Sequence, residues 1–181
     1  MRALPHLESA WDERLREVAA DREAAERAIA LADEALASAA GDERRRLLAY
    51  LGRACRLTGR VDEALMYFRV AARLRPDDVA AQIRLGETHR CRDEYEDAER
   101  ILRRALSRAR GTRHEDFALQ HLGKTLLDLG QTAAAIDCLE RALELRRAKS
   151  DEALIVSTEA ALSRARRIRQ GPGTATGQFP R

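Results

Sequence analysis

Three Leu-Gly pairs, at 51–52, 85–86 and 122–123, form the feature that most constrains the fold of this 181-residue chain. The three glycines lie 34 and then 37 residues apart. Alanine follows each glycine after twelve residues and again after nineteen, at Ala64, Ala98, Ala135, Ala71, Ala105 and Ala142. A period in this range is typical of a stack of similar small units rather than of one globular core. Such a stack offers an extended surface, so the pattern indicates a binding scaffold.

The composition favours helices throughout the chain. Charged residues make up 35% of the sequence and aromatic residues 4%, with only 10 glycines and 4 prolines. Alanine, leucine, glutamate and arginine are strong helix formers, and the β-branched residues that favour strands are scarce. Because glycine is unfavourable inside a helix, glycines at fixed positions of a helical pattern indicate a repeated structural need. The sequence therefore predicts an all-α fold.

Each repeat unit has the pattern of two helices joined by a turn. In residues 43–76, a first apolar face with helical spacing ends at Gly59, and a second one ends at Pro76. Glycine commonly ends a helix, and proline cannot continue one. Residues 77–112 and 113–149 follow the same plan.

The residues that recur in this plan carry a family resemblance. In the first unit they are Leu48, Leu51, Gly52, Cys55, Ala64, Phe68, Ala71 and Pro76. Their spacing resembles that of the tetratricopeptide repeat (TPR), W-x2-L-G-x2-Y…A-x3-F…P, with leucine in place of the tryptophan and cysteine in place of the tyrosine. The resemblance extends over residues 43–147. It implies an all-α, right-handed α-solenoid of antiparallel helix hairpins, a TPR-like superhelix.

The two ends of the chain are expected to close the stack. Residues 1–42 are interpreted as a degenerate N-terminal helix pair that covers the first unit. Its apolar stripe would consist of Trp11, Leu15 and Val18. Residues 150–170 have one apolar face and are predicted to form a capping helix. Residues 171–181 are rich in glycine, threonine and proline and are predicted to be a disordered tail.

The resemblance also implies where a partner would bind. In the tetratricopeptide family the first helix of each pair lines the concave side of the superhelix. The corresponding groove residues here are Arg46, Ala49, Arg53, Arg56, Ile83, Glu87, Arg90, Phe117, Gln120 and Lys124. This face is mostly basic with apolar interruptions, so an acidic or phosphorylated segment would suit it. The alternative interpretation is that these arginines form an ordinary solvated helix face.

Nothing in the sequence indicates catalysis, a metal or a cofactor. His89 and Cys91 are the only closely spaced pair of metal-ligand types, and no second pair completes a site. The motifs of phosphate-binding loops, serine hydrolases and zinc proteases are missing. We therefore expect a protein that is not an enzyme.

Charge and cysteine usage limit the partners and the compartment. The net charge of +3 and the scarcity of aromatic residues argue against nucleic-acid binding, despite an arginine cluster at 164–169. Cys55, Cys91 and Cys138 lie far apart, as reduced core thiols of a cytoplasmic protein would. The sequence starts without the apolar run of a signal peptide and has no stretch that would span a membrane, so no membrane partner is expected.

Two functional hypotheses follow. The first is a protein–protein interaction scaffold or adaptor that binds a peptide or protein segment, acidic in character, in the concave groove. The alternative is a self-assembling structural or regulatory helical-repeat protein, a homo-oligomer joined through its helical ends.

Overall fold

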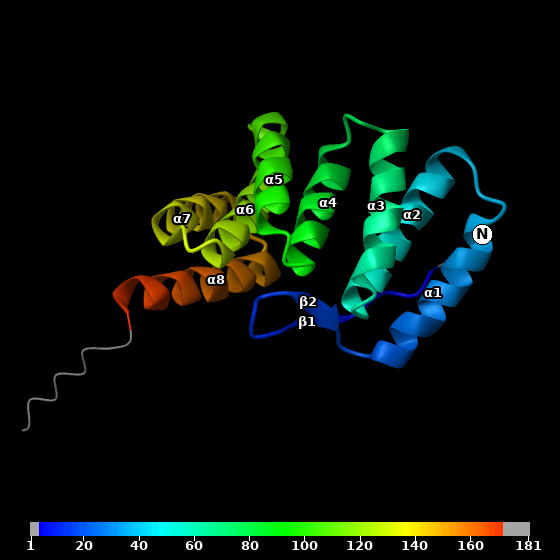
Figure 1. Cartoon of the computed structure of the whole chain (residues 1–181), viewed down its shortest axis with the longest axis horizontal. Helices are drawn as coiled ribbons and strands as arrows, with labels where there is room; N and C mark the ends of the chain where they lie inside the picture. The colour runs from blue at the N-terminus through cyan, green and yellow to red at the C-terminus, as the bar shows by residue number, and fades with distance from the viewer. Residues whose placement is uncertain (1–3, 172–181) are drawn as a thin grey trace, which may run out of the picture.

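The computed structural model describes residues 4–171, which form eight helices and one small β-hairpin (Figure 1). The hairpin comprises β1 (Ser9–Trp11) and β2 (Glu17–Ala19). The helices are α1 (Arg22–Leu36), α2 (Gly41–Leu57), α3 (Val61–Leu74), α4 (Val79–Cys91), α5 (Tyr95–Ala109), α6 (Glu115–Asp128), α7 (Thr132–Lys149) and α8 (Glu152–Gln170). The tail predicted for residues 171–181 lies, from residue 172 onward, outside the described residues.

The helices stack in chain order. Each helix packs mainly against the one before it and the one after it, and α2–α3, α4–α5 and α6–α7 form antiparallel pairs. Helix α8 packs on α7 and covers the last pair, as a capping helix does. The predicted helical solenoid is thus confirmed, with a short hairpin as its one β element among the described residues.

The repeated glycines permit close contact within each pair. A Cβ atom at Gly52 would lie 2.7 Å from Cζ of Phe68, and one at Gly86 would lie 2.6 Å from Cγ of Leu102. The third glycine repeats this arrangement against Leu139. In each pair the first helix therefore carries glycine where a large side chain of the second helix lies against its backbone, which explains the period seen in the sequence.

The buried apolar residues form two clusters along the stack. One cluster joins α1, α2 and α3, and the other joins α4 to α8. The two clusters adjoin where α3 packs on α4, and Leu85 of α4 packs against the first cluster. None of the helices in the described range is long and apolar enough to cross a membrane.

The structure differs from the sequence expectation in residues 1–42. Among residues 4–40, α1 is the only helix, and residues 9–19 form the hairpin instead of a second helix. The reason is the loop that begins at Asp12, whose carboxylate accepts hydrogen bonds from the backbone N–H groups of Arg14 (2.9 Å) and Arg16 (2.7 Å). Leu15 takes a left-handed conformation with φ of 58°, which no helix allows. The turn chemistry of aspartate therefore outweighs the helical spacing of the apolar residues.

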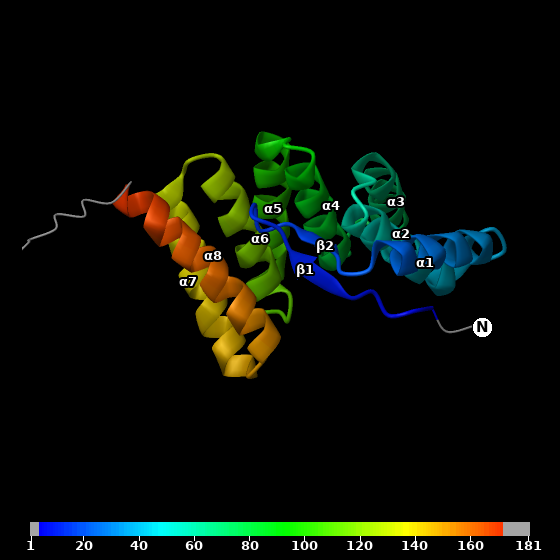
Figure 2. The same cartoon turned by 90° about the horizontal axis from the view of Figure 1, so that it is seen from below.

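The hairpin lies on the side of the stack formed by α2, α4 and α6. Figure 2 shows β1 and β2 crossing in front of these helices. Strand β2 packs on α2, and the loop between the strands reaches Arg90 of α4 and Lys124 of α6. The first helices of the three pairs therefore form one face, and the chain's own N-terminal segment lies across it.

Candidate partner-binding groove

The face formed by α2, α4 and α6 contains a cavity of about 360 Å³. Most of the groove residues predicted from sequence line it: Arg53, Arg56, Ile83, Glu87, Phe117, Gln120 and Lys124. Arg90 lies beneath the hairpin loop and is 3% exposed. Arg46 and Ala49 belong to the first half of α2 and are not part of the cavity wall.

The carboxylate of Glu17 joins the hairpin to α2. Its Oε1 accepts a hydrogen bond from Arg53 Nη2 at 2.7 Å, and its Oε2 accepts one from Arg56 Nη2 at 2.8 Å. The hydroxyl of Ser9, from the neighbouring strand, also donates to Oε1 at 2.7 Å. Two arginines of the groove thus hold one acidic side chain of the chain itself.

The backbone of the hairpin loop is held by the other two helices of the groove. Arg90 donates to the carbonyl oxygens of Arg14 and Leu15, and Lys124 donates to that of Leu15 at 3.3 Å. The ammonium of Lys124 also lies 3.9 Å from the centre of the Trp11 ring, a cation–π contact. The loop is therefore bound through its carbonyl oxygens and one aromatic ring.

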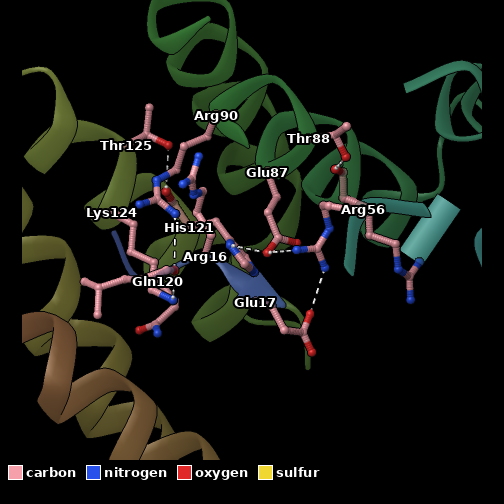
Figure 3. A network of polar contacts seen from close by, with 12 residues as sticks. Arg16, Glu17, Arg56, Glu87, Thr88, Arg90, Gln120, His121, Lys124 and Thr125 are labelled. Atoms are coloured by element: carbon pink, nitrogen blue, oxygen red, sulfur yellow. Dashed lines mark hydrogen bonds and ion pairs between the residues drawn. The ribbon is translucent and has the colours of Figure 1, made fainter. Parts of the chain in front are cut away.

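A chain of buried charges runs beneath these contacts (Figure 3). Arg56 lies between Glu17 and Glu87, with its Nη1 3.0 Å from Glu87 Oε1, and His121 Nδ1 lies 3.6 Å from the same oxygen. Farther along, Arg90 Nε donates to Asp128 Oδ2 at 2.7 Å. Charged groups buried in this way are stable only when paired, so each charge of the groove depends on its neighbours.

Burial and pairing shift the pKa values of these groups. Burial alone would raise the pKa of Glu17, but Arg56 and Arg53 outweigh it and lower the pKa from 4.5 to about 2. Burial lowers the pKa of Lys124 to about 7, assisted by the nearby Arg90. Burial also lowers the pKa of His121 to about 4, so this imidazole is neutral at pH 7. At neutral pH the groove thus holds Glu17 in its ionised form.

The cavity beside the hairpin has an apolar wall and a polar floor. Ile83, Phe117 and Leu154 provide apolar surface. Within the described part of the chain, Gln120 Oε1 and His121 Nδ1 are buried without a hydrogen-bond partner. Such a space can accept an apolar side chain of a ligand together with a polar group.

Sequence reasoning missed the hairpin residues Trp11 and Glu17 and the contribution of α8, which brings Leu154 and Ser157 to the cavity. The pattern of the repeats carries no information about what lies across the groove. Asp12 and Arg16 pair at 2.7 Å and support the loop, but an acidic and a basic residue four positions apart are also typical of a helix, so this spacing gave no signal for a hairpin.

Outside the groove, His89, Glu94 and Asp97 are the one group of potential metal ligands found among residues 4–171. His89 Nδ1 lies 2.6 Å from Glu94 Oε2, so these two side chains are partners in a hydrogen bond with each other. Cys91, which sequence spacing placed beside His89, does not join the group.

Comparisons with known proteins agree with this architecture. Tetratricopeptide repeat profiles match residues 45–88 and 77–148. No curated protein matches the chain in sequence.

Several solved structures share the fold at low sequence identity. PcrH, solved in complex with the chaperone-binding region of PopD, is 22% identical with a TM-score of 0.61, over 72% of this chain and 96% of its own. A MamA RS-1 variant is 19% identical with a TM-score of 0.56, over 83% and 90% of the two chains. A kinesin-light-chain-like protein of Podosopora anserina with TPR-like repeats is 17% identical with a TM-score of 0.55, over 80% and 75%. From its matched repeats and its stacked helix pairs, the chain belongs to the tetratricopeptide repeat family.

Proposed function

We propose that this protein is a non-enzymatic interaction scaffold or adaptor that binds an acidic segment of a partner protein in the groove formed by α2, α4 and α6. The observation that carries the proposal is the pair of arginines, Arg53 and Arg56, that holds the Glu17 carboxylate. Charge-assisted hydrogen bonds of this kind are the usual means of recognising acidic segments. The apolar wall of the adjacent cavity would add contact area for such a segment.

The related structures support a protein partner. PcrH, which has the same fold, was solved with a region of PopD bound. The unpaired thiols of Cys55, Cys91 and Cys138 suit a reducing compartment, so the proposal includes a cytoplasmic location.

The proposal is tested by capturing proteins from the cell extract on the immobilised chain and identifying them by mass spectrometry. Arg53 is partly exposed at the rim of the groove, so Arg53→Glu reverses its charge with little effect on the core. Arg69 is exposed on α3, away from the groove, and Arg69→Glu is the matched control. We expect acidic partners on the wild type and on Arg69→Glu that are at least tenfold depleted on Arg53→Glu. Equal capture by all three proteins would contradict the proposal.

Self-assembly is the second candidate, and the exposed apolar side chains of α8 favour it. Val156 is 63% exposed and Ile168 is 49% exposed at the end of the stack. Assembly through this end would give a molar mass that rises with concentration in light scattering and falls to that of one chain in the variant Val156→Ser/Ile168→Ser. A constant mass of one chain for the wild type would exclude it.

A further inference from the structure

The hairpin makes the contacts that a peptide ligand would make. Its Glu17 carboxylate pairs with Arg53 and Arg56, its loop carbonyl oxygens accept from Arg90 and Lys124, and its Trp11 ring lies against the Lys124 ammonium. The contacts thus involve a charged side chain, backbone carbonyl oxygens and an aromatic ring. These are the elements of peptide recognition in a groove.

The hairpin is also weakly held as a structural element. Each of its strands has three residues, and all three residues of β1 are exposed. A two-stranded hairpin of this size is at best marginally stable by itself. Leu15 adds backbone strain through its positive φ. The hairpin therefore depends on the groove for its order.

The groove in turn needs what the hairpin supplies. Arg56 is buried and is paired with Glu17 on one side and Glu87 on the other. Removing one partner of a buried charge is strongly unfavourable. Whatever replaces the hairpin must therefore bring a carboxylate to the position of Glu17.

The hairpin leaves part of the site unfilled. The cavity beside it is bounded by Ile83, Phe117 and Leu154, and Trp11 and Glu17 stand at its edge. A partner that keeps the contacts of the hairpin and also places an apolar side chain in this cavity gains buried surface that the hairpin lacks. Such a partner can compete with the hairpin, although the hairpin is part of the same chain as the groove.

We infer that residues 8–19, the hairpin with the exposed residue before it, are an internal occupant of the groove, and that the partner is an extended protein segment that displaces them by bringing a carboxylate between Arg53 and Arg56 and an apolar side chain to the cavity. This inference rests on the proposed function and defines both the partner chemistry and the regulation of the same groove. Only molecules whose hairpin has left the groove can bind the partner. The apparent affinity is therefore the intrinsic affinity multiplied by the fraction of molecules with an open groove.

The test uses the full chain and a synthetic peptide with the sequence of residues 4–20, labelled with a fluorophore. Glu17→Gln in the chain weakens its own hairpin, and we expect it to bind the peptide at least tenfold more tightly than the wild type does. Glu8→Gln makes the same charge change at an exposed position of the hairpin and is the matched control, with wild-type affinity expected. Trp11→Ala in the chain gives a second opened variant, because Trp11 is 47% exposed and its loss leaves the core intact.

Two results in this assay would overturn the inference. One is equal affinity of the peptide for the wild type, Glu17→Gln and Trp11→Ala. The other is undiminished binding to Glu17→Gln of a peptide that itself carries glutamine at the position of Glu17, since the carboxylate would then be irrelevant.

Displacement can be observed directly, because Trp11 is the only tryptophan of the chain. The probe is the same peptide with phenylalanine in place of its tryptophan. We expect saturating probe to increase acrylamide quenching of Trp11 in the wild-type chain as the hairpin leaves the groove. Binding of the probe with unchanged quenching would show that the hairpin stays in place. A wild-type mass of two chains in light scattering, lost in Trp11→Ala, would show that the hairpin occupies a second copy instead, which also overturns the inference.

The inference and the proposed function can fail separately. If extract partners depend on Arg53 but are captured equally by Glu17→Gln and Glu8→Gln, the groove binds partners and the hairpin does not compete. If the peptide binds Glu17→Gln tightly but no extract protein depends on Arg53, the hairpin is a displaceable occupant and the proposed scaffold function is wrong.

Discussion

Glu17 is the side chain through which the hairpin pairs with two arginines of the groove. It is only partly exposed, and it receives hydrogen bonds from Arg53, Arg56 and Ser9. These arginines keep its carboxylate ionised despite its burial and lower its pKa to about 2. A pKa that is lower in the folded state than in the unfolded state means that the ionised side chain stabilises the docked structure.

The pH dependence of hairpin docking follows from this shift. The contribution of Glu17 is complete above its ordinary pKa of 4.5 and is lost as the pH falls toward 2. The shift corresponds to a stabilisation on the order of 3 kcal/mol. We expect acrylamide quenching of Trp11 to rise in the wild type as the pH falls from 5 to 2.

The controls for this titration are the two glutamate variants. Glu17→Gln should show high quenching already at pH 7 with little further change, and Glu8→Gln should titrate like the wild type. A Glu17→Gln variant that titrates like the wild type would assign the transition to another carboxylate.

Leu15 and Asp12 show why the hairpin was not predictable from sequence. The usual signal for a tight hairpin is glycine or asparagine at the position with positive φ, and here that position is leucine. The side chain of Leu15 packs against the apolar cluster of α4 to α8, a tertiary contact that compensates for the unfavourable backbone conformation. Trp11, Leu15 and Val18 also have the spacing of a helix face, so local periodicity indicated the wrong element.

At the level of elements, the helix pairs are held together by the contact between glycine and a large side chain. In the second pair this contact joins Gly86 of α4 to Leu102 of α5, and Leu102 is fully buried. The same interaction recurs in all three pairs. A single methyl group added at the glycine position is therefore expected to lower the stability of the helix pair.

Gly86→Ala tests this sensitivity. The added methyl group would overlap Leu102, and overpacking commonly costs about 1–3 kcal/mol, while alanine regains roughly 1 kcal/mol of helix propensity. We expect a net loss of up to about 2 kcal/mol in the free energy of unfolding, measured by urea denaturation.

The double variant Gly86→Ala/Leu102→Ala provides the control. Leu102→Ala creates space for the methyl group, so the two substitutions together should cost less than the sum of their separate effects. Additive effects would mean that the two positions do not interact.

A second element-level interaction ties α6, α7 and α8 together. Asp116 of α6 is fully buried, and its carboxylate accepts from Arg146 Nε at 3.0 Å and from Lys149. Arg146 also donates to the carbonyl oxygen of Leu154 and to the hydroxyl of Thr158, both in α8. The capping helix is therefore attached through a buried guanidinium as well as through apolar contact.

Asp116→Asn should be strongly destabilising. Removing the charge leaves Arg146 buried without its counter-charge, and breaking a buried pair costs about 3–5 kcal/mol. The exposed pair Arg166–Glu140, 2.8 Å apart on α8 and α7, is the comparison. Glu140→Gln should change the free energy of unfolding by less than about 1 kcal/mol. Equal effects of the two substitutions in thermal denaturation would contradict the role assigned to Asp116.

The elements themselves were largely accessible from sequence. Apolar spacing, helix-ending glycines and the Leu-Gly period predicted the three pairs and the capping helix, because these features depend on local geometry and on contacts between neighbours. The groove face followed from the resemblance to the tetratricopeptide family, in which the first helix of each pair lines the concave side, and most of its predicted residues line the cavity. The hairpin across it depends on contacts between residues as far apart as Leu15 and Lys124, and no local pattern reports these.

At the level of the whole molecule, the hairpin adds contacts to three helices of the stack, of which α2 and α4, and also α4 and α6, touch each other directly. It contacts α2 through Arg53 and Arg56, α4 through Arg90 and α6 through Lys124. A solenoid without such a connection gains its cooperativity only from adjacent repeats. The two apolar clusters are therefore coupled more strongly when the hairpin is docked.

Urea denaturation followed by circular dichroism checks this coupling. Trp11→Ala/Glu17→Gln should unfold over a broader range of urea than the wild type, with a lower apparent slope, because the two clusters then melt separately. Glu8→Gln should keep the wild-type slope. An unchanged slope in the double variant would show that the repeats cooperate without the hairpin.

The carbonyl oxygen of Leu15 accepts from Arg90 and from Lys124 and so spans the second and third helix pairs. This oxygen atom thereby adds one link between two neighbouring repeats, which also touch directly through α4 and α6 and through the pair of Arg90 and Asp128. An incoming chain whose backbone presents its acceptors at another interval would pull these repeats closer or push them apart. The pitch of the superhelix would then differ between the form with the hairpin docked and the form with a partner bound. Binding in the groove would in this way change the curvature of surfaces far from it.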